Sequence, residues 1–102
     1  MTHNISTRYL TIRVLYPKPG SAEDIIAAVG KVSEAARKID GLVEIGAWLD
    51  RENDRIVNLS LWESKEQALK ATGEMHPMFA AIQWSEWERK PAENYLSLTR
   101  VV

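Results

Sequence analysis

The sequence contains no cysteine among its 102 residues. This absence excludes disulfide bonds, thiolate metal sites and a cysteine nucleophile, and it is consistent with a cytoplasmic protein. Histidine is also scarce, because only His3 and His76 occur and they lie far apart in the sequence. No His-x-x-x-His pair and no carboxylate pair stands at metal-ligand spacing, so we expect no catalytic metal site.

Long apolar runs and clusters of one charge are absent too. No segment has the length of apolar sequence that crosses a bilayer, and the N-terminal residues lack the apolar core of a signal peptide. We therefore expect a cytoplasmic protein without a membrane partner. The net charge is -1 and no basic cluster exceeds two residues, which argues against a nucleic-acid partner. Neither a glycine-rich phosphate loop nor a G-x-S-x-G motif is present, which argues against nucleotide binding and serine-hydrolase chemistry.

What is present fits one globular domain, with 45% hydrophobic residues, 26% charged residues and four tryptophans. We divide the chain into a flexible N-terminal arm, residues 1–8, and a single domain, residues 9–102. Four tryptophans are many for this length, and such large rigid rings suit either a core or a pocket for a flat apolar ligand.

Hydrophobic periodicity predicts an alternation of strands and helices along the domain. Two-residue alternation predicts strands, and apolar positions recurring every three or four residues predict helices. Two Ser-x-x-Asp/Gln patterns, at Ser21 and Ser64, resemble helix caps, and Asp40-Gly41 is typical of a helix end. We expect Gly73 to interrupt the second helix, with a new helix beginning at Pro77. We expect Lys90-Pro91 to end that helix before the last strand. The predicted elements are strands 9–16, 42–49, 55–62 and 95–102, and helices 22–39, 65–72 and about 77–88.

The order β-α-β-β-α-β predicts an α+β, ferredoxin-like sandwich with an antiparallel sheet covered by helices on one face. In strand 55–62, Ile56, Asn58, Ser60 and Trp62 alternate with three aliphatic residues. We expect the helices to cover the aliphatic faces of the strands. The opposite face then remains semi-polar and aromatic, either wet in a monomer or closed by a second copy, and carries Arg13, Trp48, Asn58, Ser60 and Trp62.

Asn58 and Trp62 are the best candidates for a ligand site on this face. They lie four residues apart on one strand, about 13 Å along it and on the same side. An amide and an indole N–H can hydrogen-bond the carbonyl or phenolate oxygen of an aromatic ligand. The alternative is structural, with Trp62 as a core aromatic at a strand end and Asn58 as a solvated sheet residue.

Three further residues are candidates on chemical grounds. His76 is the best general base in the sequence, and the alternative is a helix-cap or surface role, which is the commoner one for a histidine in this position. Arg13 can anchor an anionic substrate or pair with Glu44 across the strands. Phe79 lies on the apolar side of the predicted helix that begins at Pro77. We predict Asn58, Trp62 and His76 as catalytic residues, and substrate-binding residues at Arg13, Trp48, Ser60 and Phe79.

Four parts of the sequence resemble the antibiotic biosynthesis monooxygenase (ABM) family. They are the segment Val57-Asn-Leu-Ser-Leu-Trp-Glu-Ser-Lys-Glu-Gln-Ala-Leu69, the Pro-Gly turn before the first helix, Asp40-Gly41, and the segment His76-Pro-Met-Phe79. The resemblance implies a homodimer of the dimeric α+β barrel type with one cleft per subunit. It also implies an Asn and a Trp that contact substrate, at Asn58 and Trp62 here, in members that oxidise polycyclic phenols without metal or flavin.

The resemblance accordingly implies a cofactor-independent monooxygenase that uses O2 on a small aromatic substrate, with no cofactor. Those members carry a tyrosine on the following helix, where this sequence has Ala68-Leu69. The haem-degrading branch uses an axial His and a Trp, where this sequence has Ile82-Gln83 and Thr72, which disfavours haem degradation. Two alternatives remain open, a non-catalytic small-molecule-binding dimer and an isomerase that needs a base but no oxygen.

Overall fold

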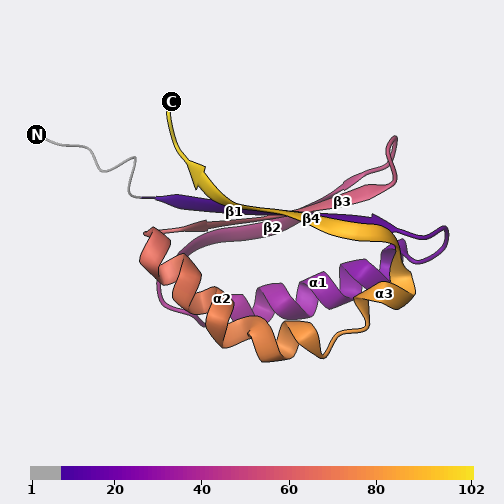
Figure 1. The fold of residues 1–102 in the computed structure, drawn as a ribbon, viewed down its shortest axis with the longest axis horizontal. Coiled ribbons are helices and arrows are strands. Elements are labelled where there is room, and N and C mark those ends of the chain that lie inside the picture. Colours follow the sequence, from indigo (N-terminus) through magenta and orange to yellow (C-terminus); the bar gives the residue numbers. More distant parts are fainter. Residues whose placement is uncertain (1–7) are drawn as a thin grey trace, which may run out of the picture.

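The computed structural model describes residues 8–102, apart from the side chains at positions 96, 97 and 99. Its strands form one antiparallel sheet in the order β2-β3-β1-β4, and all three helices lie on the same side of this sheet (Figure 1). The α+β, ferredoxin-like fold predicted from the sequence is therefore confirmed, and the helix predicted at about 77–88 is reduced to one short helix before the last strand. The elements are β1 (Tyr9–Pro17), α1 (Ala22–Ala36), β2 (Leu42–Asp50), β3 (Arg55–Trp62), α2 (Lys65–Ala80), α3 (Trp84–Trp87) and β4 (Glu88–Thr99).

Several local predictions can be checked against these bounds. The first three strands lie where alternation predicted them. The predicted end of the first helix at Asp40-Gly41 is wrong, because α1 ends at Ala36 with Arg37 as its C-cap, and Gly41, with a positive φ of 96°, lies in the connection to β2. Ser64 caps α2, because its hydroxyl accepts a hydrogen bond from the Gln67 backbone N–H at 3.2 Å. The cap predicted at Ser21 is wrong, since that side chain makes no capping hydrogen bond. The arm predicted for residues 1–8 lies, except for Arg8, outside the described residues.

The second helix is longer than predicted. It runs without a break from Lys65 to Ala80, with Pro77 inside it. A proline in a helix removes one backbone hydrogen bond, here to the carbonyl of Gly73. Packing compensates for this loss, because Ala68 and Ala71 are buried and Phe79 packs against the core around α1. Within residues 8–102, no helix combines the length and apolar character needed to cross a membrane.

The last strand begins seven residues earlier than predicted, at Glu88 instead of Tyr95. Pro91 lies within it rather than before it. The position of β4 explains this difference, because β4 is an edge strand that pairs only with β1, and a proline is tolerated where its missing N–H would face away from the ladder. The β1–β4 pairing also contains register shifts in this region.

The prediction that helices cover the aliphatic faces holds for β2, whose Ile45 and Leu49 face them, but it is wrong for β1 and β3. Cross-strand pairing places Ile56, Asn58, Ser60 and Trp62 beside Leu15, Arg13, Thr11 and Tyr9, respectively, and it is this mixed face that the helices cover. In β1 and β3 the other aliphatic residues face away from the helices, whereas Leu15, Ile45, Leu49 and Ile56 face them. We call the side away from the helices the outer face, and define it by Leu10, Val14, Trp48, Val57, Leu59, Leu61 and Tyr95.

Two separate apolar clusters explain why the mixed face is the inner one. Leu15 and Ile56 pack with α1 and with Trp84 at one end of the sheet. Tyr9 and Trp62 pack with α2 at the other end. The apolar residues therefore stand at the two ends of the inner face, whereas its middle rows are polar.

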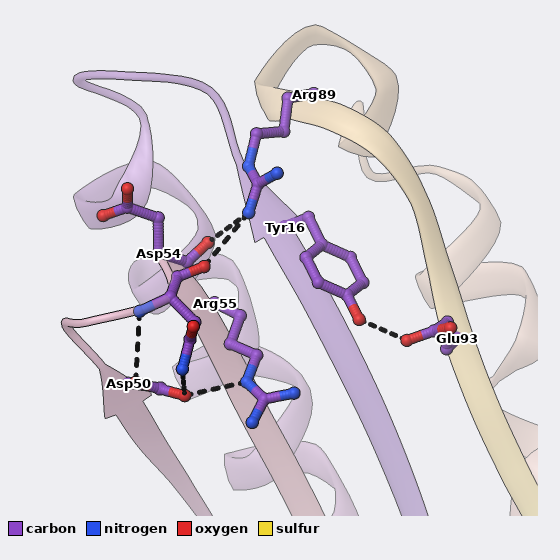
Figure 2. A network of polar contacts seen from close by, with 7 residues as sticks. Tyr16, Asp50, Asp54, Arg55, Arg89 and Glu93 are labelled. Atoms are coloured by element: carbon purple, nitrogen blue, oxygen red, sulfur yellow. Dashed lines mark hydrogen bonds and ion pairs between the residues drawn. The ribbon is translucent and has the colours of Figure 1, made fainter.

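A polar network ties β4 to the β2–β3 turn, away from the helices (Figure 2). The Arg89 Nη2 donates to the carbonyls of Asn53 and Asp54, at 3.1 and 3.0 Å. Within the turn, the Arg55 Nε donates to Asp50 at 2.8 Å. These contacts fix the start of the edge strand against a turn that is distant in the sequence.

Candidate functional site

A cavity of about 300 Å³ lies between the sheet and the helices, in the space that the two apolar clusters leave between them. This volume is at the lower end of the range for small-molecule sites and corresponds to roughly ten water molecules. Every strand contributes to its lining, together with α1 and α2. The lining residues are Thr11, Ile12, Arg13, Val32, Ala36, Ile45, Asn58, Ser60, Trp62, Ala71, Thr72, Met75, His76, Phe79 and Asn94.

One cross-strand row supplies three polar side chains to the cavity. Asn58 of β3 pairs with Arg13 of β1, which pairs with Asn94 of β4. The Asn58 Nδ2 donates to the backbone carbonyl of Gly46 at 3.0 Å, which fixes the orientation of the amide. This bond leaves the Asn58 carbonyl oxygen and its second amide hydrogen as groups that a ligand can use.

A second polar chain starts from the buried indole of Trp62. Its Nε1–H donates to the Ser60 hydroxyl at 2.9 Å, and Ser60 forms a short hydrogen bond with Thr11. Trp62 is only 5% exposed, so its N–H is used inside the protein and the ring forms part of the cavity wall. Whichever hydroxyl donates in the Ser60–Thr11 pair, one hydroxyl hydrogen remains that can bond a ligand.

Arg13 is the cation of the cavity. Its guanidinium carbon lies 3.9 Å from the centroid of the Phe79 ring and 5.5 Å from that of Trp84, and Nη1 donates to the Asn94 Oδ1 at 3.2 Å. Burial lowers the pKa of Arg13 below its ordinary value, and Glu88 partly offsets this effect. The guanidinium stays charged at neutral pH, because an arginine loses its proton only under strongly basic conditions.

The α2 wall presents Thr72, Met75, His76 and Phe79 to the cavity. Their spacing of three, one and three residues places them along one helix face. Phe79 is held in place, because its ring stacks on Trp84 at 4.8 Å and its carbonyl accepts from the Trp84 Nε1 at 3.0 Å. The His76 side chain is exposed, so it can exchange protons with solvent as well as with a molecule in the cavity.

The structure brings together six of the seven residues that we selected from the sequence: Arg13, Asn58, Ser60, Trp62, His76 and Phe79 all line this cavity. Trp48 does not. It lies on the outer face, 55% exposed, with its ring close above Gly46, so that a Cβ at that glycine would lie 3.0 Å from the ring.

Two further expectations are wrong in geometry. Arg13 does not pair with Glu44, because the register places Glu44 beside Leu61, facing away from the helices. The open semi-polar face does not exist either, since helices of the same chain cover it. The cleft is therefore built from a single chain, and it opens to solvent where His76 and Asn94 are exposed.

Sequence reasoning missed Thr11, Thr72 and Asn94 among the polar lining residues. The signal for Thr11 was available, because it alternates in phase with Arg13 on the same strand. Asn94 was missed because Pro91 was interpreted as a break, which left position 94 outside the predicted last strand. The apolar contributions of Val32 and Ala36 follow from the predicted apolar stripe of α1.

Comparison with known proteins agrees with this geometry. The model of the family described as antibiotic biosynthesis monooxygenase matches residues 8–83, well over half of the chain. The chain belongs to the ABM family. A search of curated protein sequences finds no match, so the family assignment rests on the family model and the fold.

Solved structures show the same ABM fold at low sequence identity. Rv0793 from Mycobacterium tuberculosis has a TM-score of 0.81 and 16% identity, covering 94% of this chain and 97% of that one. PA3566 from Pseudomonas aeruginosa has a TM-score of 0.77 and 16% identity, covering 99% and 100%. SnoaB from Streptomyces nogalater, described as a cofactor-independent oxygenase, has a TM-score of 0.76 and 12% identity, covering 94% and 96%. At these identities the likeness establishes the ABM fold and leaves the reaction to the residues of the cavity.

Proposed function

We propose that this ABM-family chain is a cofactor-independent monooxygenase that uses O2 to oxidise a small aromatic substrate in the cavity between sheet and helices. The observation that carries the proposal is the convergence of Asn58, Trp62 and His76 on one cavity of about 300 Å³ in a chain of this family. A cavity with one aromatic wall, two hydrogen-bonding centres and a titratable base matches the requirements of this chemistry.

The proposed reaction converts a substrate CH2 group flanked by aromatic rings into a carbonyl. His76 accepts one proton from the CH2 carbon, and the carbanion reduces O2 and bonds to it, which gives a peroxide on that carbon. The protonated peroxide then loses water as the second C–H proton leaves. One oxygen atom stays on the substrate and the other leaves as water, so the substrate itself supplies all four electrons.

The residues of the cavity would assist two charged stages. The Asn58 amide hydrogen and the free hydroxyl hydrogen of the Thr11–Ser60 pair would stabilise the oxyanion of the deprotonated substrate and the peroxide. Trp62 would contribute its ring face and hold Ser60 in place, since its N–H already donates to that hydroxyl. This role differs from the direct indole hydrogen bond that the sequence led us to expect.

Oxygen consumption with anthrone, whose CH2 group is flanked by two aromatic rings, tests the proposal. We expect the Asn58→Ala/Trp62→Phe double variant to lose about 100-fold or more in rate, because removing one oxyanion-binding donor alone costs about that much. His76→Gln should reduce the rate by a similar factor. Trp48→Phe, outside the cavity, is the control and should keep the wild-type rate. Unchanged oxygen consumption in the double variant would refute the assignment of the site.

The same cavity also supports an isomerase, because His76 offers a base beside hydrogen-bond donors. An isomerase would exchange the substrate's acidic C–H proton with deuterated solvent in the absence of oxygen, in a manner that depends on His76. A non-catalytic binding protein would show binding with neither oxygen consumption nor proton exchange. Measuring both quantities on the same substrate separates the three functions.

We further propose that the protein is a homodimer joined through the outer face. Aliphatic side chains of the neighbouring strands β1 and β3 form the middle of this face, and Trp48 of β2 and Tyr95 of β4 on it are 55% and 45% exposed. An exposed apolar sheet of this kind fits a self-complementary interface. Sedimentation should give a dimer for the wild type and a monomer for Leu59→Arg, with Ala27→Arg on the exposed side of α1 as a control that stays dimeric. A wild type that sediments as a monomer would contradict this assembly.

A further inference from the structure

The cavity contains a positive charge that no acidic side chain neutralises. In the described part of the chain, the only pair of opposite charges within 4.0 Å is Arg55 with Asp50, at the far turn. Arg13 has a neutral hydrogen-bond partner, Asn94, and two aromatic neighbours, Phe79 and Trp84. Glu88 acts on it only as a more distant charge.

Arg13 is also incompletely hydrogen-bonded. Its Nε is buried without a hydrogen-bond partner, and a buried donor without an acceptor is destabilising. A guanidinium has five N–H groups, and the structure gives acceptors to only one of its nitrogens. A half-buried cation with one buried, unused donor and no acidic partner is a costly feature unless another group completes it.

The neighbours of Arg13 define the shape and chemistry of that group. Phe79 fixes the guanidinium from one side, and Asn58 lies beside Arg13 in the same cross-strand row. Val32, Met75 and the Trp62 ring supply apolar surface around the same space. A planar apolar body with an oxygen-centred negative charge would fill the cavity and meet both kinds of surface.

We propose that Arg13 selects substrates by charge, so that the cavity takes flat aromatic molecules carrying a carboxylate or phenolate oxyanion in preference to neutral analogues. This inference rests on the proposed function in using the same cavity as the substrate site. It adds the charge of the substrate, which neither the family nor the fold specifies. Arg13 is accordingly a specificity-determining residue that holds the oxyanion.

Binding of naphthoate and naphthamide to the full chain tests the proposal, because the two ligands share a ring system and differ in charge at neutral pH. Calorimetry, or quenching of tryptophan fluorescence beside the cavity, measures both affinities. We expect naphthoate to bind at least about tenfold more tightly, as charge-assisted hydrogen bonds provide. Raising the salt concentration should change this ratio little if the pair is shielded from solvent.

Two variants identify the charge responsible. Arg13→Gln should reduce the preference to about twofold or less, since a neutral amide retains hydrogen bonding without charge. Arg51→Gln removes the same charge from the exposed β2–β3 turn and should keep the wild-type preference. If Arg13→Gln fails to fold, Arg13→Lys and the wild-type comparison replace it. Equal affinities in the wild type, no measurable binding of either ligand at millimolar concentration, or equal losses in both glutamine variants would overturn the proposal.

A phenol provides the second arm, because the visible absorbance of para-nitrophenol reports its ionised fraction. If Arg13 binds phenolates, the bound ligand should ionise at lower pH than the free ligand, and Arg13→Gln should remove this difference. A naphthoate preference without any change in nitrophenol ionisation would restrict the site to carboxylates. None of these binding measurements depends on oxygen, so the two proposals can fail separately. Charge selection without oxygen consumption would refute only the proposed reaction. Oxygen consumption without charge selection would refute only the role of Arg13 in selecting charged substrates.

Discussion

The Trp62–Ser60 hydrogen bond should be visible as a coupling energy between two mutations. Ser60 and Trp62 are 8% and 5% exposed, and their hydrogen bond is 2.9 Å long. In Ser60→Ala the indole N–H remains buried without an acceptor, which we expect to destabilise the protein by about 1–3 kcal/mol. Trp62→Phe removes the donor and also part of a buried ring, so its cost includes a cavity contribution of roughly 1–2 kcal/mol.

The double variant Ser60→Ala/Trp62→Phe loses both partners of the bond, so no indole donor is left unsatisfied. Its destabilisation should therefore fall below the sum of the single variants by about 1–2 kcal/mol. Urea unfolding of the wild type and the three variants gives the four free energies of the cycle. Ser85→Ala, in an exposed position of α3, is the control and should change stability by less than about 0.5 kcal/mol.

The double-mutant cycle can contradict the proposed interaction between Ser60 and Trp62 directly. Additivity within about 0.3–0.5 kcal/mol would mean that the two side chains do not interact energetically. The Trp62 N–H would then be free for another acceptor, and the direct indole contact to substrate expected from the sequence would regain support over the positional role proposed above.

Two further predictions concern the turns that frame the site. Gly41→Ala and Gly20→Ala, at φ of +96° and +82°, should each destabilise the protein by the backbone strain of about 1–2 kcal/mol. The atoms within 4 Å of a new Cβ at position 41 belong to the end of the flexible Gln67 side chain, which can move, and no atom lies within 4 Å at position 20. A much larger loss in thermal unfolding for Gly41→Ala than for Gly20→Ala would contradict this reasoning. The pKa of Asp50 is lowered from 3.8, first by the Asn53 side-chain hydrogen bond, so its stabilising contribution is full above that ordinary value and is lost as pH falls through the folded pKa. Asp50→Asn should accordingly lower the urea midpoint at neutral pH and narrow the difference from wild type in strong acid, and a difference that stays constant with pH would contradict the assignment.

The comparison of sequence and structure shows which information periodicity contains. Alternation correctly grouped Thr11, Arg13 and Leu15 on one side of β1, because side chains on a strand alternate by geometry alone. It did not identify which side meets the helices. The usual expectation that helices cover the more aliphatic side holds for β2 but failed for β1 and β3, since the inner face obtains its apolar packing there from strand-end residues such as Ile56 and Trp62.

Glycine and proline residues, which usually interrupt helices and strands, were the least reliable guide where tertiary packing supports a continuous element. Gly73 and Pro77 each weaken a helix, yet α2 continues through both because one of its faces packs on the sheet and α1. Pro91 is compatible with a strand because that strand is at the edge of the sheet. Neither context is encoded in the neighbouring residues, so the bounds of α2 and β4 could not follow from local sequence.

The residues of the site were more predictable than the bounds of α2 and β4, because the site places polar side chains where a core normally has apolar ones. A sheet face covered by helices normally carries apolar side chains, whereas this one carries Arg13, Asn58, Ser60 and Thr11 in its middle rows. Polar residues at buried positions reduce stability unless they serve another purpose. Cross-strand register, which the sequence does not show, then converts these separately conspicuous residues into one cavity. The register also pairs Arg13 with Asn58, and this adjacency of a cation and an amide makes a bound oxyanion the simplest completion of the site.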